Sequence, residues 1–151
     1  MIEGVKRDIA KLRGYTYEDY GISKYRYKEL KSFCLQYNEK KAKIQYGLKG
    51  VTADGMPHGN SVGSPTERRA VDNVLLENDI KAIEDAAKAV ADITGVDIAS
   101  FILKSVTQDT AYENIEYDAE KGRIPIGKTD FYACRRLFYS CLDRKDKGVE
   151  L

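Results

Sequence analysis

The fold is decided near the end of the chain by residues 128–139, KTDFYACRRLFY. The apolar residues Phe131, Cys134 and Phe138 recur there at spacings of three and four, which predicts a helix with one buried face. We expect the opposite face to carry polar and aromatic side chains, namely Lys128, Thr129, Tyr132, Arg135, Arg136 and Tyr139. A helix with such an outer face is either a solvated surface helix or one that binds a polyanion.

The residues before this helix predict a shorter helix and a tight turn. Thr110 and Glu113 have the spacing of a capping box, which satisfies free backbone N–H groups at a helix start. We expect Gly122 to end that helix in a left-handed conformation, and Pro125 to prevent its continuation. Together the segments predict a helix-turn-helix.

Two longer helices are predicted upstream. The first should run from about Ser23 to Tyr46, with an apolar stripe at Tyr27, Leu30, Cys34, Tyr37, Ile44 and Leu48. The second should begin at Ser64-Pro65-Thr66-Glu67, which combines a capping serine with a first-turn proline and a glutamate. It should extend to about Thr94 and bury Leu76, Ile80, Ile83, Ala87 and Val90. Residues 47–63, rich in glycine, predict a long surface loop.

The expected fold is all-α, with a long antiparallel helical hairpin followed by a three-helix unit that contains the helix-turn-helix. Gly95 should end the second long helix, and Asp97 should cap the next one. We therefore predict two parts: residues 1–94 as an arm for assembly or partner contact, and residues 95–151 as the helix-turn-helix unit.

The net charge is +1, but the charged residues are unevenly distributed along the sequence. Residues 1–50 hold 12 Lys and Arg against 6 Asp and Glu, residues 51–120 hold 5 against 14, and residues 121–151 hold 8 against 4. A basic cluster beside a helix-turn-helix is what phosphate neutralisation requires. The alternative is that the three regions neutralise one another inside one fold.

The sequence predicts no enzyme, no metal site and no cofactor. It lacks a P-loop and a nucleophile elbow, and its only histidine, His58, lies with Asp54 and Asn60 in the predicted loop, which offers no rigid scaffold. The three cysteines, Cys34, Cys134 and Cys141, are expected to be buried thiols. No apolar run approaches the roughly 18 residues of a membrane span, so we expect a cytoplasmic protein without a membrane partner.

Several segments resemble a known family. They are residues 25–37 (YRYKELKSFCLQY), 54–59 (DGMPHG), 64–67 (SPTE) and 124–132 (IPIGKTDFY). In this order they are similar to the late-gene transcriptional regulators of the RinA/ArpU type, from phages and prophages of Gram-positive bacteria. The resemblance covers roughly residues 20–145 and implies a helix-turn-helix similar to the promoter-reading region of sigma factors, acting in the host bacterial cell.

The leading hypothesis is a DNA-binding transcriptional regulator whose last helix enters the major groove of double-stranded DNA. The candidate DNA-binding residues are Arg123, Lys128, Thr129, Tyr132, Ala133, Arg135, Arg136 and Tyr139. Host RNA polymerase and a second copy of the chain are further candidate partners. Two alternatives stay open: a small terminase-like component of DNA packaging, which would form a ring of many subunits, and a helical protein–protein adaptor, which would show no salt-sensitive affinity for DNA.

Overall fold

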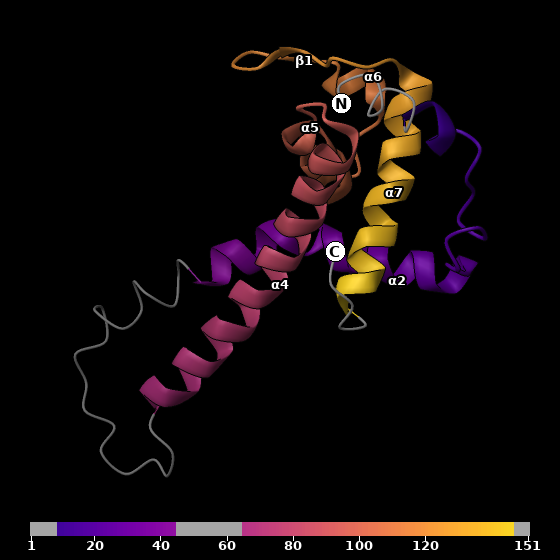
Figure 1. Cartoon of the computed structure of the whole chain (residues 1–151). Coiled ribbons are helices and arrows are strands. Elements are labelled where there is room, and N and C mark those ends of the chain that lie inside the picture. The colour runs from indigo at the N-terminus through magenta and orange to yellow at the C-terminus, as the bar shows by residue number, and fades with distance from the viewer. Residues whose placement is uncertain (1–8, 45–64, 147–151) are drawn as a thin grey trace.

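The computed structural model of the protein describes residues 9–44 and 65–146. The predictions for residues 47–63, which include Leu48, and for Ser64 lie outside the described residues. The helices are α2 (Lys24–Leu35), α4 (Pro65–Thr94), α5 (Ala99–Gln108), α6 (Tyr112–Ile115) and α7 (Lys128–Asp146), and residues 9–12 and 37–44 are also helical. A single antiparallel hairpin joins β1 (Tyr117–Asp118) to β2 (Gly122–Arg123) within these ranges (Figure 1). The described part is thus mostly helical, as the all-α prediction requires.

The first long helix is shorter than expected. α2 begins at Lys24, close to the predicted start at Ser23, and Ser23 caps it, because its hydroxyl accepts the Arg26 N–H at 3.1 Å. The helix then ends at Leu35, a turn at Gln36 interrupts it, and a separate helix follows over residues 37–44. The two pieces have different neighbours. α2 packs chiefly against α5 and α7, whereas Tyr37 and Lys40 in the second piece contact Glu84 and Asp79 of α4.

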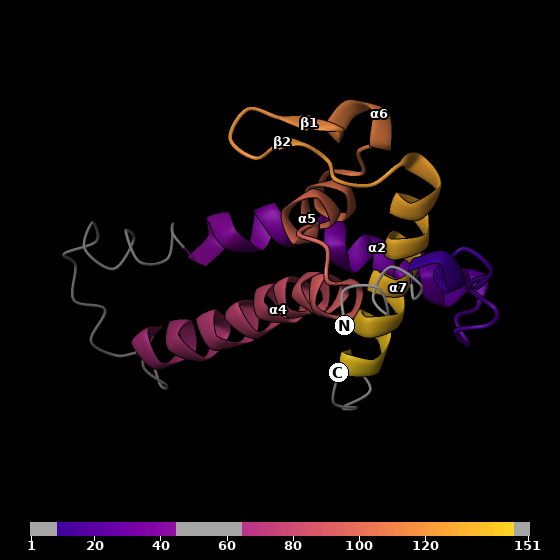
Figure 2. The same ribbon diagram turned by 45° about the horizontal axis from the view of Figure 1, so that its top comes forward.

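α4 follows its prediction closely. It begins at Pro65, where the missing N–H costs no hydrogen bond, and ends at Thr94 before Gly95, whose φ of 71° is left-handed. Its 30 residues correspond to roughly 45 Å at 1.5 Å per residue. The C-terminal half packs against α7 and α5, and the N-terminal half extends away from both (Figures 1 and 2).

One hydrophobic core joins both predicted parts of the chain. It contains Leu12, Leu30 and Ile83 from the predicted arm together with Ile102 and Phe131 from the predicted helix-turn-helix unit. α7 lies at its centre, packed against α4, α5 and α2. The core therefore does not follow the expected boundary between residues 94 and 95.

The connection from α5 to α7 differs from the predicted helix and tight turn. Ala111, not Thr110, is the N-cap of α6, and Ile98, not Asp97, is the N-cap of α5; neither makes a side-chain cap. α6 ends at Ile115, and the β1–β2 hairpin follows it. Gly122 is left-handed as predicted, with φ of 78°, but it lies in β2 and not at a helix end.

Asp118 explains why a hairpin forms at this point. Its carboxylate accepts the backbone N–H groups of Glu120 at 2.7 Å and Lys121 at 2.9 Å, which closes the turn. These backbone hydrogen bonds hold the pKa of Asp118 below its ordinary value. Ile124 then donates its N–H to the carbonyl of Glu116, the C-cap of α6, at 2.7 Å. This hydrogen bond holds the end of the hairpin beside α6 before α7 begins.

Candidate nucleic-acid interface

Two predicted DNA-binding residues are buried inside the protein. Tyr139 is 0% exposed, so the prediction that it lies on the outer face of α7 is wrong. Ala133, a candidate for DNA contact, is also 0% exposed. α7 has neighbours on two sides: α4 contacts one, and the rings of Tyr17 and Tyr27 pack on Tyr139 from the other, with centroid separations of 6.3 and 5.2 Å. A helix enclosed in this way presents only part of its polar side to solvent.

Arg135 is a mostly buried cation beside this same aromatic cluster. Its side chain is 11% exposed, and its guanidinium lies 3.7 Å from the carboxylate of Asp109. Burial raises the pKa of Tyr139, and the charge of Arg135 opposes that shift. Arg135 is therefore positioned to stabilise the packing of α7. The spacing predicted that it would face solvent, but most of its side chain does not.

The first turn of α7 remains exposed. The side chain of Lys128 is 61% exposed, and Thr129 beside it is exposed as well. Lys128 forms an ion pair with Glu113 of α6, and their hydrogen bond raises the pKa of Lys128 and lowers that of Glu113. This end of α7 is therefore accessible to a macromolecule.

Two hydrogen bonds of tyrosine hydroxyls fix α6 beside this turn. The Tyr132 hydroxyl accepts the backbone N–H of Tyr112 at 3.2 Å, and the Tyr112 hydroxyl donates to the carbonyl of Ile126 at 3.0 Å. Tyr132 is half-buried as a result, and its predicted contact with DNA would use only the remaining ring surface. α6 and the start of α7 thus form one rigid corner.

The N-terminal segment supplies a cation that the sequence did not predict. Arg13 forms an ion pair with Asp130, and its second guanidinium nitrogen donates to the same carboxylate at 3.1 Å. Arg136 donates from Nε to the carbonyl of Tyr15 at 2.9 Å. Arg13 and Asp130 are 117 positions apart in the sequence, so no local pattern could have joined them. The basic character of residues 1–50 was the only signal.

The start of α7 thus carries Lys128 and is contacted by Arg13, and Arg136 lies about two turns further along the helix. The strand β2, which carries the exposed Arg123, lies on the same side of the molecule as the start of α7 (Figure 2). Asp130 and Glu113 neutralise two of these cations. Exposed ion pairs of this kind contribute little to stability, so a phosphate group can replace the carboxylate at small cost. The arrangement is suited to binding an extended polyanion.

In the parts of the chain that the structure covers, no group of three or more His, Cys, Asp or Glu side chains could hold a metal ion. No helix among the described residues is long and apolar enough to cross a bilayer. Comparison of the chain with protein-family models, curated proteins and solved structures finds no match.

Proposed function

We propose that the protein binds double-stranded DNA with the exposed start of α7 and acts as a transcriptional regulator without catalysis. The observation that carries this proposal is the accessible first turn of α7, bordered by cations from both the N-terminal and the C-terminal segments. The N-terminal end of a recognition helix is the part that contacts base edges in helix-turn-helix proteins.

The burial of individual side chains narrows the set of residues that can take part. Ala133, Arg135 and Tyr139 are excluded from the proposed interface because they lie within the protein. Lys128 and Thr129 are then the candidates for base contacts. Arg13, Arg123 and Arg136 are the candidates for phosphate contacts, with Tyr132 between the two groups.

The assignment to transcription rests on the sequence. The resemblance to RinA/ArpU-type regulators supports a role at a promoter in a bacterial host, where RNA polymerase would be the second partner. DNA binding itself rests on the charge and accessibility of the α7 start, so it can be tested first and separately.

The proposal is tested by selecting sequences from a random pool of duplex DNA and titrating the selected duplex with salt. The double variant Arg13→Ala/Arg123→Ala removes two of the candidate phosphate contacts, so it should reduce the magnitude of the slope of log K against log salt by roughly 2, since each phosphate contact contributes about 0.9. The matched control is Lys43→Ala/Lys81→Ala, which removes two exposed cations from the 37–44 helix and α4 and should leave the slope unchanged. If the wild-type protein shows no salt-dependent affinity for any duplex, the proposal is wrong.

A further inference from the structure

The two faces of the β1–β2 hairpin carry different side chains. Tyr117 lies directly opposite Arg123, so both side chains are on one face, and both residues are exposed. Successive side chains of a strand alternate between faces, so the next pair, Asp118 and Gly122, belongs to the other face together with Ile124. That second face is less exposed, and Ile124 on it is buried. The outer face of the two strands therefore joins an aromatic ring to a cation.

The exposure of Tyr117 sets it apart from the other tyrosines of the C-terminal segment. Tyr117 is 71% exposed, whereas Tyr112, Tyr132 and Tyr139 are buried or half-buried. A ring that stays in water gains no stability from burial, so Tyr117 adds little to the packing of the hairpin. Its ring is instead available to stack on another ring.

Hydrogen bonds fix the direction in which this outer face points. Ile124 donates its N–H to the carbonyl of Glu116 at one end of the hairpin, and the carboxylate of Asp118 closes the turn at the other. The Tyr112 hydroxyl then holds the carbonyl of Ile126, where the chain leaves the hairpin. The hairpin projects from the body of the molecule beside α6 (Figures 1 and 2). Its outer face is thus preorganised, which lowers the entropic cost of binding.

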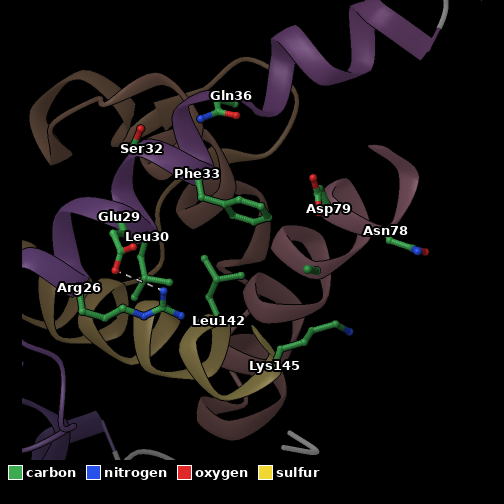
Figure 3. A pocket seen from close by; sticks show the side chains of 11 residues that line it. Arg26, Glu29, Leu30, Ser32, Phe33, Gln36, Asn78, Asp79, Leu142 and Lys145 are labelled. Carbon is green, nitrogen blue, oxygen red and sulfur yellow. Dashed lines mark ion pairs between the residues drawn. The ribbon is translucent and has the colours of Figure 1, made fainter. Parts of the chain in front are cut away.

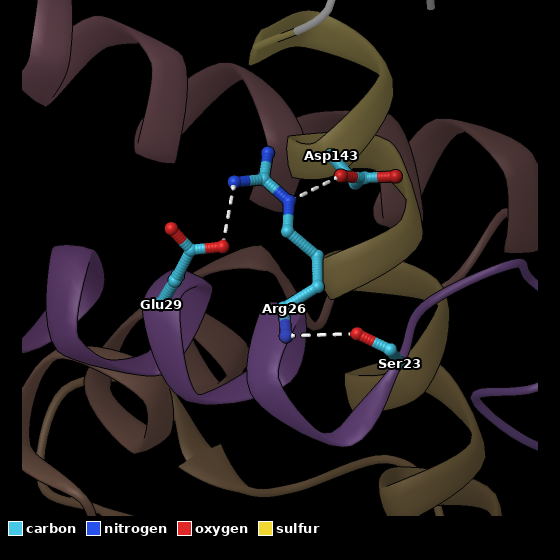
Figure 4. A network of polar contacts seen from close by, with 4 residues as sticks. All are labelled: Ser23, Arg26, Glu29 and Asp143. Atoms are coloured by element: carbon cyan, nitrogen blue, oxygen red, sulfur yellow. Dashed lines mark hydrogen bonds and ion pairs between the residues drawn. The ribbon is translucent and has the colours of Figure 1, made fainter.

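The cation of the hairpin is also available to an anion. A groove of about 590 Å³ between α2, α4 and α7 offers a contrast, because its wall combines Phe33 with a cation that is already paired (Figure 3). That cation, Arg26, donates to Asp143 at 2.7 Å and lies 3.6 Å from Glu29 (Figure 4). Arg123 has no ion-pair partner among the described residues. A phosphate group at Arg123 therefore has no carboxylate to displace.

We propose that the hairpin binds a single-stranded segment of DNA, with the ring of Tyr117 stacked on an unpaired base and Arg123 on a phosphate of the same strand. Residues directly opposite in a hairpin have Cβ atoms about 5 Å apart, so the two side chains can contact one nucleotide. A base within a duplex is already stacked and must be unstacked at a cost, so an exposed ring is suited to an unpaired strand. Binding of such a strand does not require duplex binding by α7.

The experiment measures the affinity of the full chain for a blunt duplex, for the same duplex with a short single-stranded thymidine overhang, and for the single strand alone. The overhang should strengthen binding by the wild-type protein. Tyr117→Ala should weaken binding to the overhang and to the single strand by roughly fivefold or more, as the loss of one stacked base predicts. Tyr117→Phe should bind as the wild type does, because stacking uses the ring and not the hydroxyl.

Tyr25→Ala is the matched control. Tyr25 is 74% exposed and has the ammonium group of Lys28 5.6 Å from the centre of its ring, so it is also an exposed tyrosine beside a cation. It belongs to α2, which lies away from the hairpin (Figure 1). Its replacement should leave the affinity for the overhang unchanged.

A fluorescent purine analogue in the overhang, of the kind whose emission falls on stacking, tests the contact itself. The wild-type protein and Tyr117→Phe should quench the emission, and Tyr117→Ala should not. An overhang that adds no affinity, or a gain and a quenching that survive Tyr117→Ala, would overturn the proposal. An equal loss of affinity for the blunt duplex in Tyr117→Ala would also do so, because the ring would then contact paired DNA.

The blunt duplex separates this site from the one proposed at α7. A protein that binds the blunt duplex and gains nothing from the overhang retains the α7 interface and lacks the hairpin site. A protein that binds only the single strand, through Tyr117, has the hairpin site and lacks the α7 interface.

Discussion

Tyr37 and Tyr139 are both buried in the core but differ in the partner of the hydroxyl group. The Tyr37 hydroxyl donates to Glu84 at 2.5 Å, whereas the Tyr139 hydroxyl, which lies beside Arg135, makes no hydrogen bond of normal geometry among the described residues. A hydrogen bond to a charged group contributes about 1.5–3 kcal/mol to the free energy of unfolding. A hydroxyl without a hydrogen bond makes no such contribution, so its removal should cost no stability. Removal of the hydroxyl should therefore change the free energy of unfolding by different amounts at the two positions.

We predict that Tyr37→Phe lowers the free energy of unfolding by about 1–3 kcal/mol, while Tyr139→Phe changes it by less than about 0.5 kcal/mol. Urea denaturation of both variants measures the difference. A large loss in Tyr139→Phe would show that its hydroxyl has a partner, with Arg135 as the first candidate because its Nε is also without one within the described residues.

The three thiols give a prediction about pH. Burial raises the pKa of Cys34 and Cys134 to about 12 and that of Cys141 to about 11, from an ordinary value of 9.0. A thiol with a raised pKa in the folded state contributes stability that is present below pH 9 and is lost as the pH rises toward 12. We therefore expect the free energy of unfolding to fall over this range.

The thiols of the native protein should also react slowly with Ellman's reagent at neutral pH, because all three are buried and protonated. After denaturation in guanidinium all three should react at once. The alkaline loss of stability should be smaller in Cys34→Ala than in the wild type. An equal loss in the variant would assign the effect to Cys134, Cys141 or the buried tyrosines instead.

At the scale of elements, the hairpin between α6 and α7 depends on one backbone conformation. Gly122 has a φ of 78°, and a Cβ atom placed there would meet nothing within 4 Å. A substitution at this position is therefore costly because of the left-handed backbone and not because of a clash. At Gly14 a Cβ atom would lie 3.6 Å from the Lys11 carbonyl, an ordinary contact, and the backbone lacks a left-handed φ, so Gly14 serves as a matched position.

We predict that Gly122→Ala destabilises the protein by about 1 kcal/mol, whereas Gly14→Ala is neutral or stabilises it by up to about 1 kcal/mol. Thermal unfolding of the two variants measures the contrast. Equal midpoints would mean that the hairpin can adopt another turn without cost.

Local signals predicted the elements that depend on local chemistry. Ser23 at the start of α2, Pro65 at the start of α4 and Gly95 at its end are all found where the sequence placed them. The break at Gln36 was missed because the helix pattern continues through it, and different tertiary neighbours separate the two pieces. The hairpin was missed because two-residue strands have too little periodicity to be recognised.

The candidate interface was predictable only in part. Spacing placed Lys128 and Thr129 on an exposed side of α7, where they are found. The same spacing could not show that Tyr17 and Tyr27 cover Tyr139, or that Arg13 reaches Asp130, because these contacts join opposite ends of the chain. A helical pattern identifies one apolar face, but it cannot identify a second face that other segments cover.

At the scale of the whole molecule, the single core predicts cooperative unfolding. Ile83 of α4 and Phe131 of α7 are both 0% exposed and belong to the same cluster. Ile83→Ala should cost about 2–5 kcal/mol and lower one transition, seen equally by tyrosine near-ultraviolet and helical far-ultraviolet circular dichroism. The control Ile93→Ala, on the exposed side of α4, should change the midpoint little. Two separate transitions would contradict a single core.

The same core predicts the behaviour of a fragment. A peptide of residues 95–151 would expose the side of α7 that packs against α4, so we expect low helix content and no cooperative melting. Circular dichroism of that peptide is the measurement. If the fragment folds on its own, the result would support the predicted division of the chain between residues 94 and 95.

The position of α7 at the centre of the core has a consequence for synthesis of the protein. The ribosome makes this helix after every other described element, so Ile83, Val90 and Ile102 lack their central packing partner until it emerges. Contacts between distant parts of a chain must wait for both parts to exist, which slows folding. Until α7 has emerged, the nascent chain would hold a hydrophobic surface open to chaperones and proteases, and a product that stops before α7 would keep it open permanently.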